Sequence, residues 1–200
     1  RPSKFEIREV NVNKVLENAL SLLSYQKNFK NIQTQLNLQV NLPLIKGDES
    51  QLSQVFINIM LNGIDAMPGG GTLEIQSEEY LVEDSFPIRK HRPYPTRRRG
   101  DPMESDYLHL RKADPIYVLL TKFSRGDRLV RIRISDTGIG IKKEDLERIF
   151  DPFFTTKSPD KGTGLGLSIS LRIVESMGGE IRVESEIGKG SSFELYFPAI

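Results

Sequence analysis

The sequence contains no cysteine and only two histidines, His91 and His109, among its 200 residues. Without cysteine there are no disulfide bonds, zinc–thiolate sites or thiol nucleophiles, and two histidines are too few for a histidine-rich metal site. No apolar run approaches the roughly 20 residues that span a bilayer, and no signal peptide is expected in these residues. We therefore expect a soluble, cytoplasmic unit, although these residues leave open whether the full-length protein is anchored in a membrane.

An excess of charge of one sign is also lacking. The chain has 28 Lys and Arg against 27 Asp and Glu, so its net charge is +1 at pH 7. The electrostatics of the whole chain therefore indicate no polyanionic partner. Its hydrophobic content of 38% suits one sizeable domain or two small ones.

The pattern of apolar residues predicts four helices separated by strands. The helices are expected to begin at a cap on Asn13, to run from Asp48 to about Met67, and to occupy 145–150 and 165–177. Strands are expected at 32–40, 42–46, 72–78, 129–136, 180–186 and 192–197. Antiparallel hairpins with helices between them are typical of an α+β two-layer sandwich with helices on one face of the sheet.

Two segments depart from this compact plan. Residues 1–10 lack periodicity and are expected to be a linker from an upstream domain, with the main domain at 11–200. An insertion at about 79–128 separates two strands that a short hairpin could join, and so long a connection is uncommon. Its apolar end, 116–123, predicts an extra strand. Ten basic and six acidic residues between 80 and 126 leave an excess too small to indicate nucleic-acid binding, so no nucleic-acid partner is expected.

Three alternating glycines, Gly162, Gly164 and Gly166, stand directly before an apolar helical pattern that begins at Leu167. Glycine lets a backbone approach a ligand closely, and the N–H groups of a helix's first turn favour anions. The spacing matches neither the dinucleotide-binding nor the P-loop glycine fingerprint. By itself the stretch is equally consistent with a phosphate-binding loop and with a flexible loop before an ordinary helix.

The helix expected at 48–67 is apolar over most of its circumference and should be largely buried. One stripe differs, because amide and acid side chains recur on it at helical spacing: Gln51, Gln54, Asn58, Asn62 and Asp65. Asparagine is a poor residue for a helix interior, and a buried amide without a partner costs roughly 1–3 kcal/mol. Solvent-facing stripes usually carry lysine and glutamate instead, so we favour a stripe that lines a ligand site.

Asp136 ends an expected strand and is followed by Thr137-Gly138-Ile139-Gly140. A carboxylate in this place can accept hydrogen bonds from an amino group, and the glycines leave room for a flat ring beside the backbone. Asp and Gly are common in turns. The motif therefore indicates a ligand site only in combination with the asparagine helix and the glycine stretch.

In this order, four motifs make the chain similar to the ATP-binding catalytic domain of bacterial sensor histidine kinases, in the GHKL superfamily that includes gyrase B, MutL and the Hsp-type chaperones. QVFINIMLNGIDAM (54–67) resembles the N box, and DTGIGI (136–141) resembles the first glycine box. IFDPFFTTK (149–157) resembles the F box, which favours the kinase branch, and GTGLGLSIS (162–170) resembles the second glycine box. The resemblance covers essentially the whole chain except the insertion. It implies the Bergerat fold, a mixed sheet backed by helices with a mobile ATP lid.

The resemblance also implies ATP and Mg²⁺ as cofactors, and roles for individual residues. Asn62 matches the asparagine that ligates Mg²⁺, and Asn58, one turn earlier, is expected to touch the phosphates or a metal-bound water. Asp136 matches the residue that binds the adenine amino group, with Gly138 and Gly140 providing backbone room. The remaining residues expected at the nucleotide are Thr155, Thr156, Lys157, Gly162, Thr163, Gly164, Leu165 and Gly166. Asn58 and Lys157 are the expected catalytic residues.

The lid is expected at 152–163, mobile without nucleotide, with Phe153 and Phe154 as apolar latches against the body. An acid at Asp65 departs from the lysine or other polar group that the family often has there. Because an acid would repel phosphate, Lys157 is expected to supply the positive charge instead.

In the ATP-hydrolysing relatives the position of Asn58 holds a glutamate that activates water. An amide cannot take that proton, so the phosphoryl group should wait for another acceptor. That acceptor is not expected in this chain, because neither His91 nor His109 has the H-E-x-x-P setting. The resemblance thus implies a fragment whose partners are ATP or ADP, its own dimerisation and phosphotransfer domain, and a response regulator, within a homodimeric full-length protein.

Two alternatives compete with this histidine kinase interpretation. An ATP-driven clamp of the gyrase or MutL type is disfavoured by the amide at Asn58 and by the FFTTK segment. A nucleic-acid-binding module built on the basic insertion is disfavoured by its small excess of charge.

Overall fold

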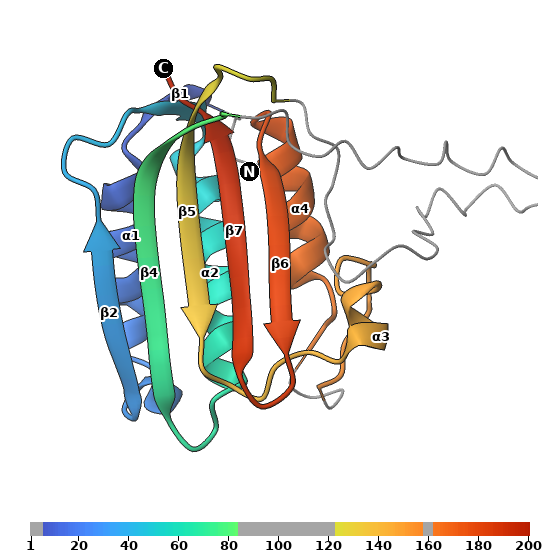
Figure 1. The fold of residues 1–200 in the computed structure, drawn as a ribbon. Helices are drawn as coiled ribbons and strands as arrows, with labels where there is room; N and C mark the ends of the chain where they lie inside the picture. The colour runs from blue at the N-terminus through green and yellow to red at the C-terminus, as the bar shows by residue number, and fades with distance from the viewer. Residues whose placement is uncertain (1–5, 84–122, 158–161) are drawn as a thin grey trace, which may run out of the picture.

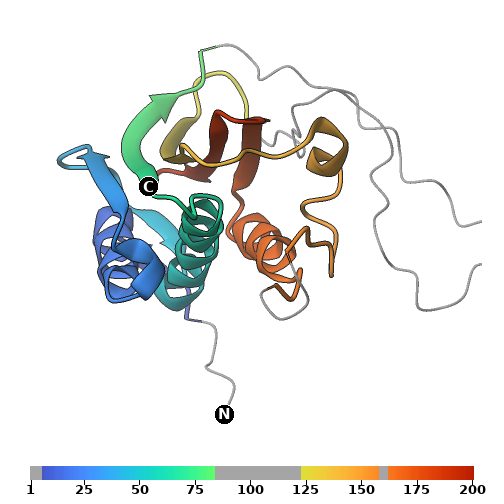
Figure 2. The same cartoon turned by 90° about the horizontal axis from the view of Figure 1, so that it is seen from below.

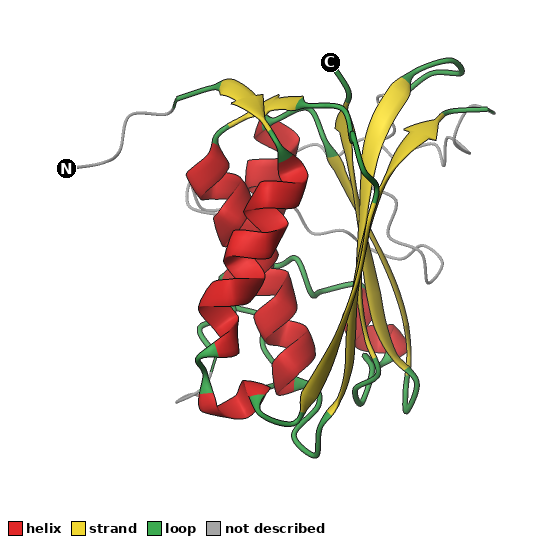
Figure 3. Cartoon of the chain, turned by 90° about the vertical axis from the view of Figure 1, so that its left-hand side faces the viewer, coloured by secondary structure: helices red, strands yellow, loops and turns green. Residues whose placement is uncertain are grey.

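The computed structural model describes residues 6–83, 123–157 and 162–200. These residues form two layers, a five-stranded sheet and a layer of three helices on one of its faces (Figures 1 and 3). The expected α+β sandwich with helices on one face is confirmed. No helix in these ranges is long and apolar enough to cross a membrane.

In spatial order, the sheet consists of β2 (Ile32–Leu38), β4 (Gly71–Leu81), β5 (Arg128–Asp136), β7 (Gly190–Pro198) and β6 (Glu180–Glu186). The helices on its face are α1 (Val12–Ser24), α2 (Glu49–Asp65) and α4 (Gly166–Ser176). A single turn of helix, α3 (Lys143–Leu146), lies beyond the β6 edge (Figure 1). β2 pairs with β4 in parallel and the other neighbours are antiparallel, so the sheet is mixed, as the resemblance implied.

Alternation along the strands decides which side chains enter the core. On β5, Val130, Ile132 and Ile134 face the helices and are buried. The residues between them point to the open face, where Arg131 pairs with Glu78 across the strands. One apolar face and one charged face are typical of a sheet covered on a single side.

The N-terminal residues are tied into the domain more firmly than the sequence predicts. β1 (Arg8–Val10) pairs antiparallel with β3 (Ile45–Gly47), and Val10 is buried. The prediction of Asn13 as the cap of α1 is wrong, because the Asn11 side chain accepts the Lys14 N–H and takes that role. Asn13 instead lies in the first turn, where its amide donates to the Gln39 carbonyl at 2.9 Å.

The described residues bound the insertion more narrowly than 79–128. β4 continues to Leu81, and β5 begins at Arg128. Val82 and Phe123 pack together in a small apolar cluster at this end of the sheet. The basic segment, His91, His109 and nearly all of the expected strand at 116–123 lie outside the described residues.

Asp48 is confirmed as the cap of α2, and its pKa predicts how the stability of the domain depends on pH. It accepts hydrogen bonds from Ser50 and from the backbone N–H groups of Glu6 and Gln51, and these bonds lower the pKa of Asp48 to about 2. We expect Asp48→Ala to lower the free energy of unfolding by about 1 kcal/mol at pH 7. A pKa below the usual 3.8 means that this contribution is present above pH 4 and is lost as the pH falls towards 2.

Chemical denaturation at pH 7, 4, 3 and 2 measures this effect. The difference between wild type and Asp48→Ala should shrink over the lower part of this range. Asp48→Asn is the matched control, because it keeps a capping oxygen but cannot titrate. A difference between wild type and Asp48→Ala that stays constant down to pH 2 would contradict the assignment of the low pKa to this cap.

Candidate active site

The helix α2 lies between α1 and α4 in the helical layer (Figure 2). This helix is largely buried, as its sequence predicts: six of its apolar side chains are buried, and Ile57 and Leu61 are partly buried against the core. The asparagines of its polar stripe are half-buried on the side of α4 and of the segment that precedes α4. Asn58 and Asn62 therefore do not face open solvent, whereas Gln54 and Asp65 of the same stripe are exposed.

Asp136, at the end of β5, is a largely buried carboxylate with a relative exposure of 8%. Its Oδ1 accepts the Gly138 N–H at 2.8 Å. Burial raises the pKa of Asp136, and hydrogen bonds from the backbone N–H groups of Gly138 and Ser191 oppose that rise. The carboxyl group is thus held in one place by the backbone.

The first glycine box is packed against its surroundings. A Cβ on Gly138 would lie 2.6 Å from the Ala66 carbonyl oxygen and 2.7 Å from Asp136 Oδ1. Gly140 has φ +72, and a Cβ there would overlap the carbonyl of Glu186 at the end of β6. Both positions therefore require glycine, Gly138 beside the carboxylate and Gly140 for the path of the loop.

Asn58 joins α2 to the start of α4. Its Nδ2 donates to the Gly166 carbonyl at 3.2 Å and to the Ser170 hydroxyl at 3.3 Å. A carbonyl only accepts hydrogen bonds, so the amide nitrogen must face α4. The Oδ1 that remains is an acceptor, which suits a water or a cation better than a phosphate oxygen.

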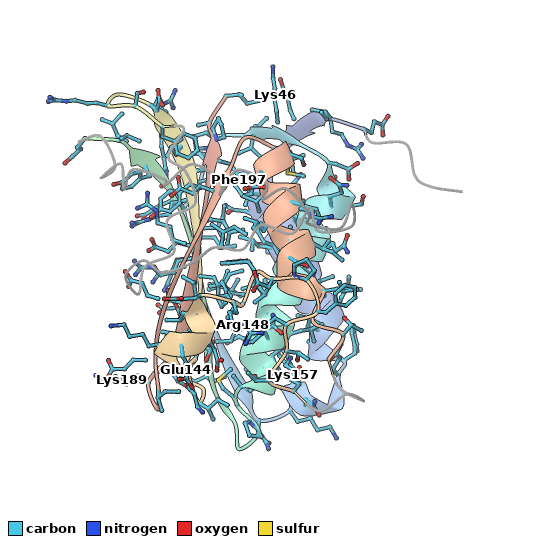
Figure 4. All side chains as sticks on the ribbon, turned by 90° about the vertical axis from the view of Figure 1, so that its right-hand side faces the viewer. Lys46, Glu144, Arg148, Lys157, Lys189 and Phe197 are labelled. Atoms are coloured by element: carbon cyan, nitrogen blue, oxygen red, sulfur yellow. The ribbon has the colours of Figure 1, made fainter. Side chains whose placement is uncertain are left out.

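Lys157 lies beside the C-terminal end of α2 (Figure 4). Its ammonium donates to Asn62 Oδ1 at 3.0 Å and to Asp65 Oδ2 at 2.6 Å. An ammonium has no acceptor atom, so the Asn62 oxygen must face it. The structure therefore brings together two residues that the sequence placed at the metal and at the triphosphate, and it adds Asp65 as their neighbour.

The glycine stretch leads directly into α4 and leaves the start of that helix uncapped. Leu165 occupies the N-cap position without a side-chain cap bond, and no acidic residue lies in the first turn. Gly164 has φ +68, and a Cβ there would overlap the backbone of Phe153. Within the described part of the chain no side chain caps this end of α4, so the N–H groups of its first turn are available to an anion.

The described residues of the expected lid fold back on one another. The Thr155 hydroxyl accepts the Lys157 N–H at 3.1 Å, and a Cβ on Gly162 would lie 2.7 Å from the same hydroxyl. Thr156 is exposed, and the Thr163 hydroxyl accepts the Leu165 N–H at 3.4 Å. Residues 158–161 lie outside the described residues, so the mobility of the lid stays a prediction.

The prediction that Phe153 packs against the body as an apolar latch is wrong. The side chain of Phe153 is 66% exposed, and its backbone adopts φ +66, which turns it away from the body. Phe154 is partly buried against the core, and the Arg148 guanidinium lies 4.5 Å from its ring centroid. Spacing alone cannot distinguish two adjacent aromatic residues, because a left-handed residue in the turn decides which one points inward.

Some residues at the site lack a recognisable signal in the sequence. A Cβ on Gly63 would lie 3.1 Å from Asp136 Cβ, so this glycine lets α2 approach the carboxylate. Ser191 supplies a backbone N–H to Asp136, and a Cβ on the preceding Gly190 would overlap the Asp136 carbonyl oxygen. Gly190 and Ser191 belong to β7, which pairs with β5 at this point, so only the register of the sheet reveals them.

Comparison with known proteins connects this geometry with a family. The family described as "Histidine kinase-, DNA gyrase B-, and HSP90-like ATPase" matches residues 106–200. The chain is 32% identical to Sporulation kinase E of Bacillus subtilis (strain 168) over 198 residues, which are 99% of this chain and 20% of that protein. It is 30% identical to Sensor histidine kinase ZraS of Salmonella typhimurium over 200 residues, which are 100% of this chain and 33% of that protein.

A solved structure agrees with these relatives. The catalytic domain of histidine kinase ThkA superimposes with a TM-score of 0.66 at 26% identity, covering 97% of this chain and 96% of that one. The chain thus spans a fifth to a third of the two curated relatives, and nearly all of the solved catalytic domain.

Proposed function

The chain belongs to the histidine kinase-, DNA gyrase B- and HSP90-like ATPases, and from this premise we propose that it is the ATP-binding catalytic domain of a sensor histidine kinase. In this role it transfers the γ-phosphoryl group of ATP to a histidine on a separate domain. The observation that carries the proposal is the amide at Asn58, tied to the start of α4 in the place where a water-activating carboxylate would stand.

Binding of the adenine is assigned to Asp136. One of its oxygens is already satisfied by Gly138, and the carboxylate retains acceptor capacity for an exocyclic amino group. Gly63 and Gly138 keep side chains away from this carboxylate. A charge-assisted hydrogen bond in a buried site is a strong selector for an amino-bearing base.

The triphosphate is assigned to the start of α4 and to Lys157. The first turn of α4 offers N–H donors, and the Lys157 ammonium supplies a positive charge. Neither group is a nucleophile, so the domain positions the phosphates and neutralises their charge, as in other phosphoryl transfers.

Magnesium is assigned to Asn62. The donor set fits, because Mg²⁺ prefers a few oxygen ligands and retained waters, and the Oδ1 of Asn62 already holds a cationic group, the ammonium of Lys157. When bound, Mg²⁺ would neutralise phosphate charge. The remaining acceptor oxygen of Asn58 suits one of its waters.

The phosphoryl acceptor is assigned to another part of the protein. An imidazole nitrogen of a dimerisation domain would attack the γ-phosphorus while ADP leaves, and a response regulator would then receive the phosphoryl group. We place this domain in the cytoplasm, within a homodimer of the full-length protein. These partners follow from the family and from the much greater length of the relatives.

A two-fragment assay tests this function. This chain alone should hydrolyse ATP very slowly and should not label itself, since no carboxylate stands at Asn58 to activate water. Mixed with the dimerisation domain of its parent protein and labelled ATP, it should place acid-labile phosphate on that partner only. Rapid release of phosphate by this chain alone would instead assign it to the clamp ATPases.

A further inference from the structure

The ion pair between Lys157 and Asp65 is not needed by the fold. Both side chains are about a third exposed, with relative exposures of 33% and 35%, and neither belongs to the hydrophobic core. An ion pair this exposed adds little to stability. Its consequence lies in its position, because the ammonium also occupies the oxygen of Asn62.

Asn62 and Asp65 lie three residues apart on α2, so they present their side chains to the same side of the helix. Together they offer one neutral and one anionic oxygen, and the Lys157 ammonium bridges them at 3.0 and 2.6 Å. The shorter contact is the charged one. Asp65 therefore anchors the ammonium, and Asn62 accepts it as a second partner.

From this geometry, and resting on the proposed function, we propose that Lys157 and Mg²⁺ compete for the Oδ1 of Asn62, and that Asp65 sets the balance by retaining Lys157. A second cation on the same oxygen would meet the charge of the ammonium at close range, and like charges at such distances repel strongly. Loading of the metal-bound nucleotide then requires Lys157 to leave Asn62. Asp65 is thus a positioning residue: by holding Lys157 on Asn62 it weakens the binding of Mg²⁺ and of the metal-bound nucleotide.

Movement of Lys157 away from Asn62 also affects the residues before α4, where the triphosphate is assigned. The Lys157 N–H is held by the Thr155 hydroxyl, and a Cβ on Gly162 would lie 3.1 Å from the Lys157 Cβ. Departure of Lys157 from α2 therefore disturbs the segment that contacts Gly162, just before α4. The released ammonium is then free to meet the triphosphate, which also competes with Asp65 for it.

A double-mutant cycle in calorimetry tests the proposal. Asp65→Asn should strengthen binding of ATP with Mg²⁺ about threefold, the size expected for a partly exposed ion pair, and should lower the Mg²⁺ concentration that half-saturates this binding. In the Lys157→Met background the same substitution should have almost no effect. Glu49→Gln is the matched control, because it removes an equal charge from the exposed first turn of the same helix.

Two other outcomes of this cycle overturn the proposal. If Asp65 merely repels phosphate, Asp65→Asn will strengthen binding equally with EDTA and with Mg²⁺, and in both Lys157 backgrounds. If Asp65 itself supports the metal, Asp65→Asn will weaken the Mg²⁺-dependent part. Absence of any nucleotide binding by the wild-type chain would instead count against the proposed function.

Hydrogen exchange without nucleotide gives a second readout that is independent of ATP. Asp65→Asn and Lys157→Met should each speed amide exchange in residues 153–157 by a similar factor, and the double variant should add nothing further. Exchange in this segment that is unchanged in both single variants would show that the ion pair does not hold the segment, and the proposal would fail.

Discussion

Asp136→Asn is expected to weaken nucleotide binding at least about 100-fold, corresponding to ~2.7 kcal/mol. The substitution changes hardly any volume, but it replaces an acceptor-only group with one that carries an NH₂. One side of Asp136 already receives the Gly138 N–H. Whichever way the asparagine is oriented, its NH₂ therefore faces a donor, either the backbone N–H or the amino group of the base.

Calorimetry with ATP and ADP, each with and without Mg²⁺, measures this loss. It should be the same for both nucleotides and should not depend on the metal, because the contact is to the base. Thermal unfolding should remain cooperative, and Glu184→Gln, an exposed single-charge change on β6, should bind normally. Unchanged affinity in Asp136→Asn would remove the adenine assignment.

Gly190→Ala is expected to lower the free energy of unfolding by at least about 3 kcal/mol, and the melting temperature by about 6–12 °C. Gly190 has φ +103, a conformation that L-residues rarely adopt, and its Cβ would overlap the carbonyl oxygen of Asp136. The end of β5 would have to move away from the β6–β7 turn. Since Asp136 belongs to that end, the variant should also lose nucleotide affinity.

Gly188→Ala separates the two causes within the same turn. Gly188 also has a positive φ, +78, but a Cβ there meets nothing within 4 Å. It should therefore show only the strain of the left-handed backbone, about 1–2 kcal/mol, with nucleotide binding unchanged. Equal destabilisation by the two variants would show that the overlap with Asp136 adds nothing to the loss in free energy of unfolding.

Elements with strong local signals were predictable from the sequence. The strand at 180–186 was predicted with its observed ends, and the cap of α2 on Asp48 is confirmed. Alternation and capping depend on residues within a few positions of one another, so short-range chemistry determines them. The cap of α1 was misplaced by two residues, because Asn11 and Asn13 both carry capping side chains.

Other features arise from partners that are distant in the sequence. β1 was not predicted because its three residues gain strand structure only by pairing with β3, which lies more than thirty residues further along the chain. The roles of Gly190 and Ser191 beside Asp136 depend on the register of β5 and β7. Short segments carry too little periodicity to reveal such pairings.

By itself, the sequence determined which chemical groups this domain contains: amides at Asn58 and Asn62 on a buried helix, a carboxylate at the end of a strand, and glycines before a helix. Only the tertiary structure decided what these groups touch. It turns the Asn58 amide nitrogen towards Gly166, 108 residues away, and places the Lys157 ammonium on Asn62, 95 residues away. Residue type sets which bonds a group is able to make, but the packing of distant elements selects the partner, because a donor binds whichever acceptor the fold brings within about 3 Å.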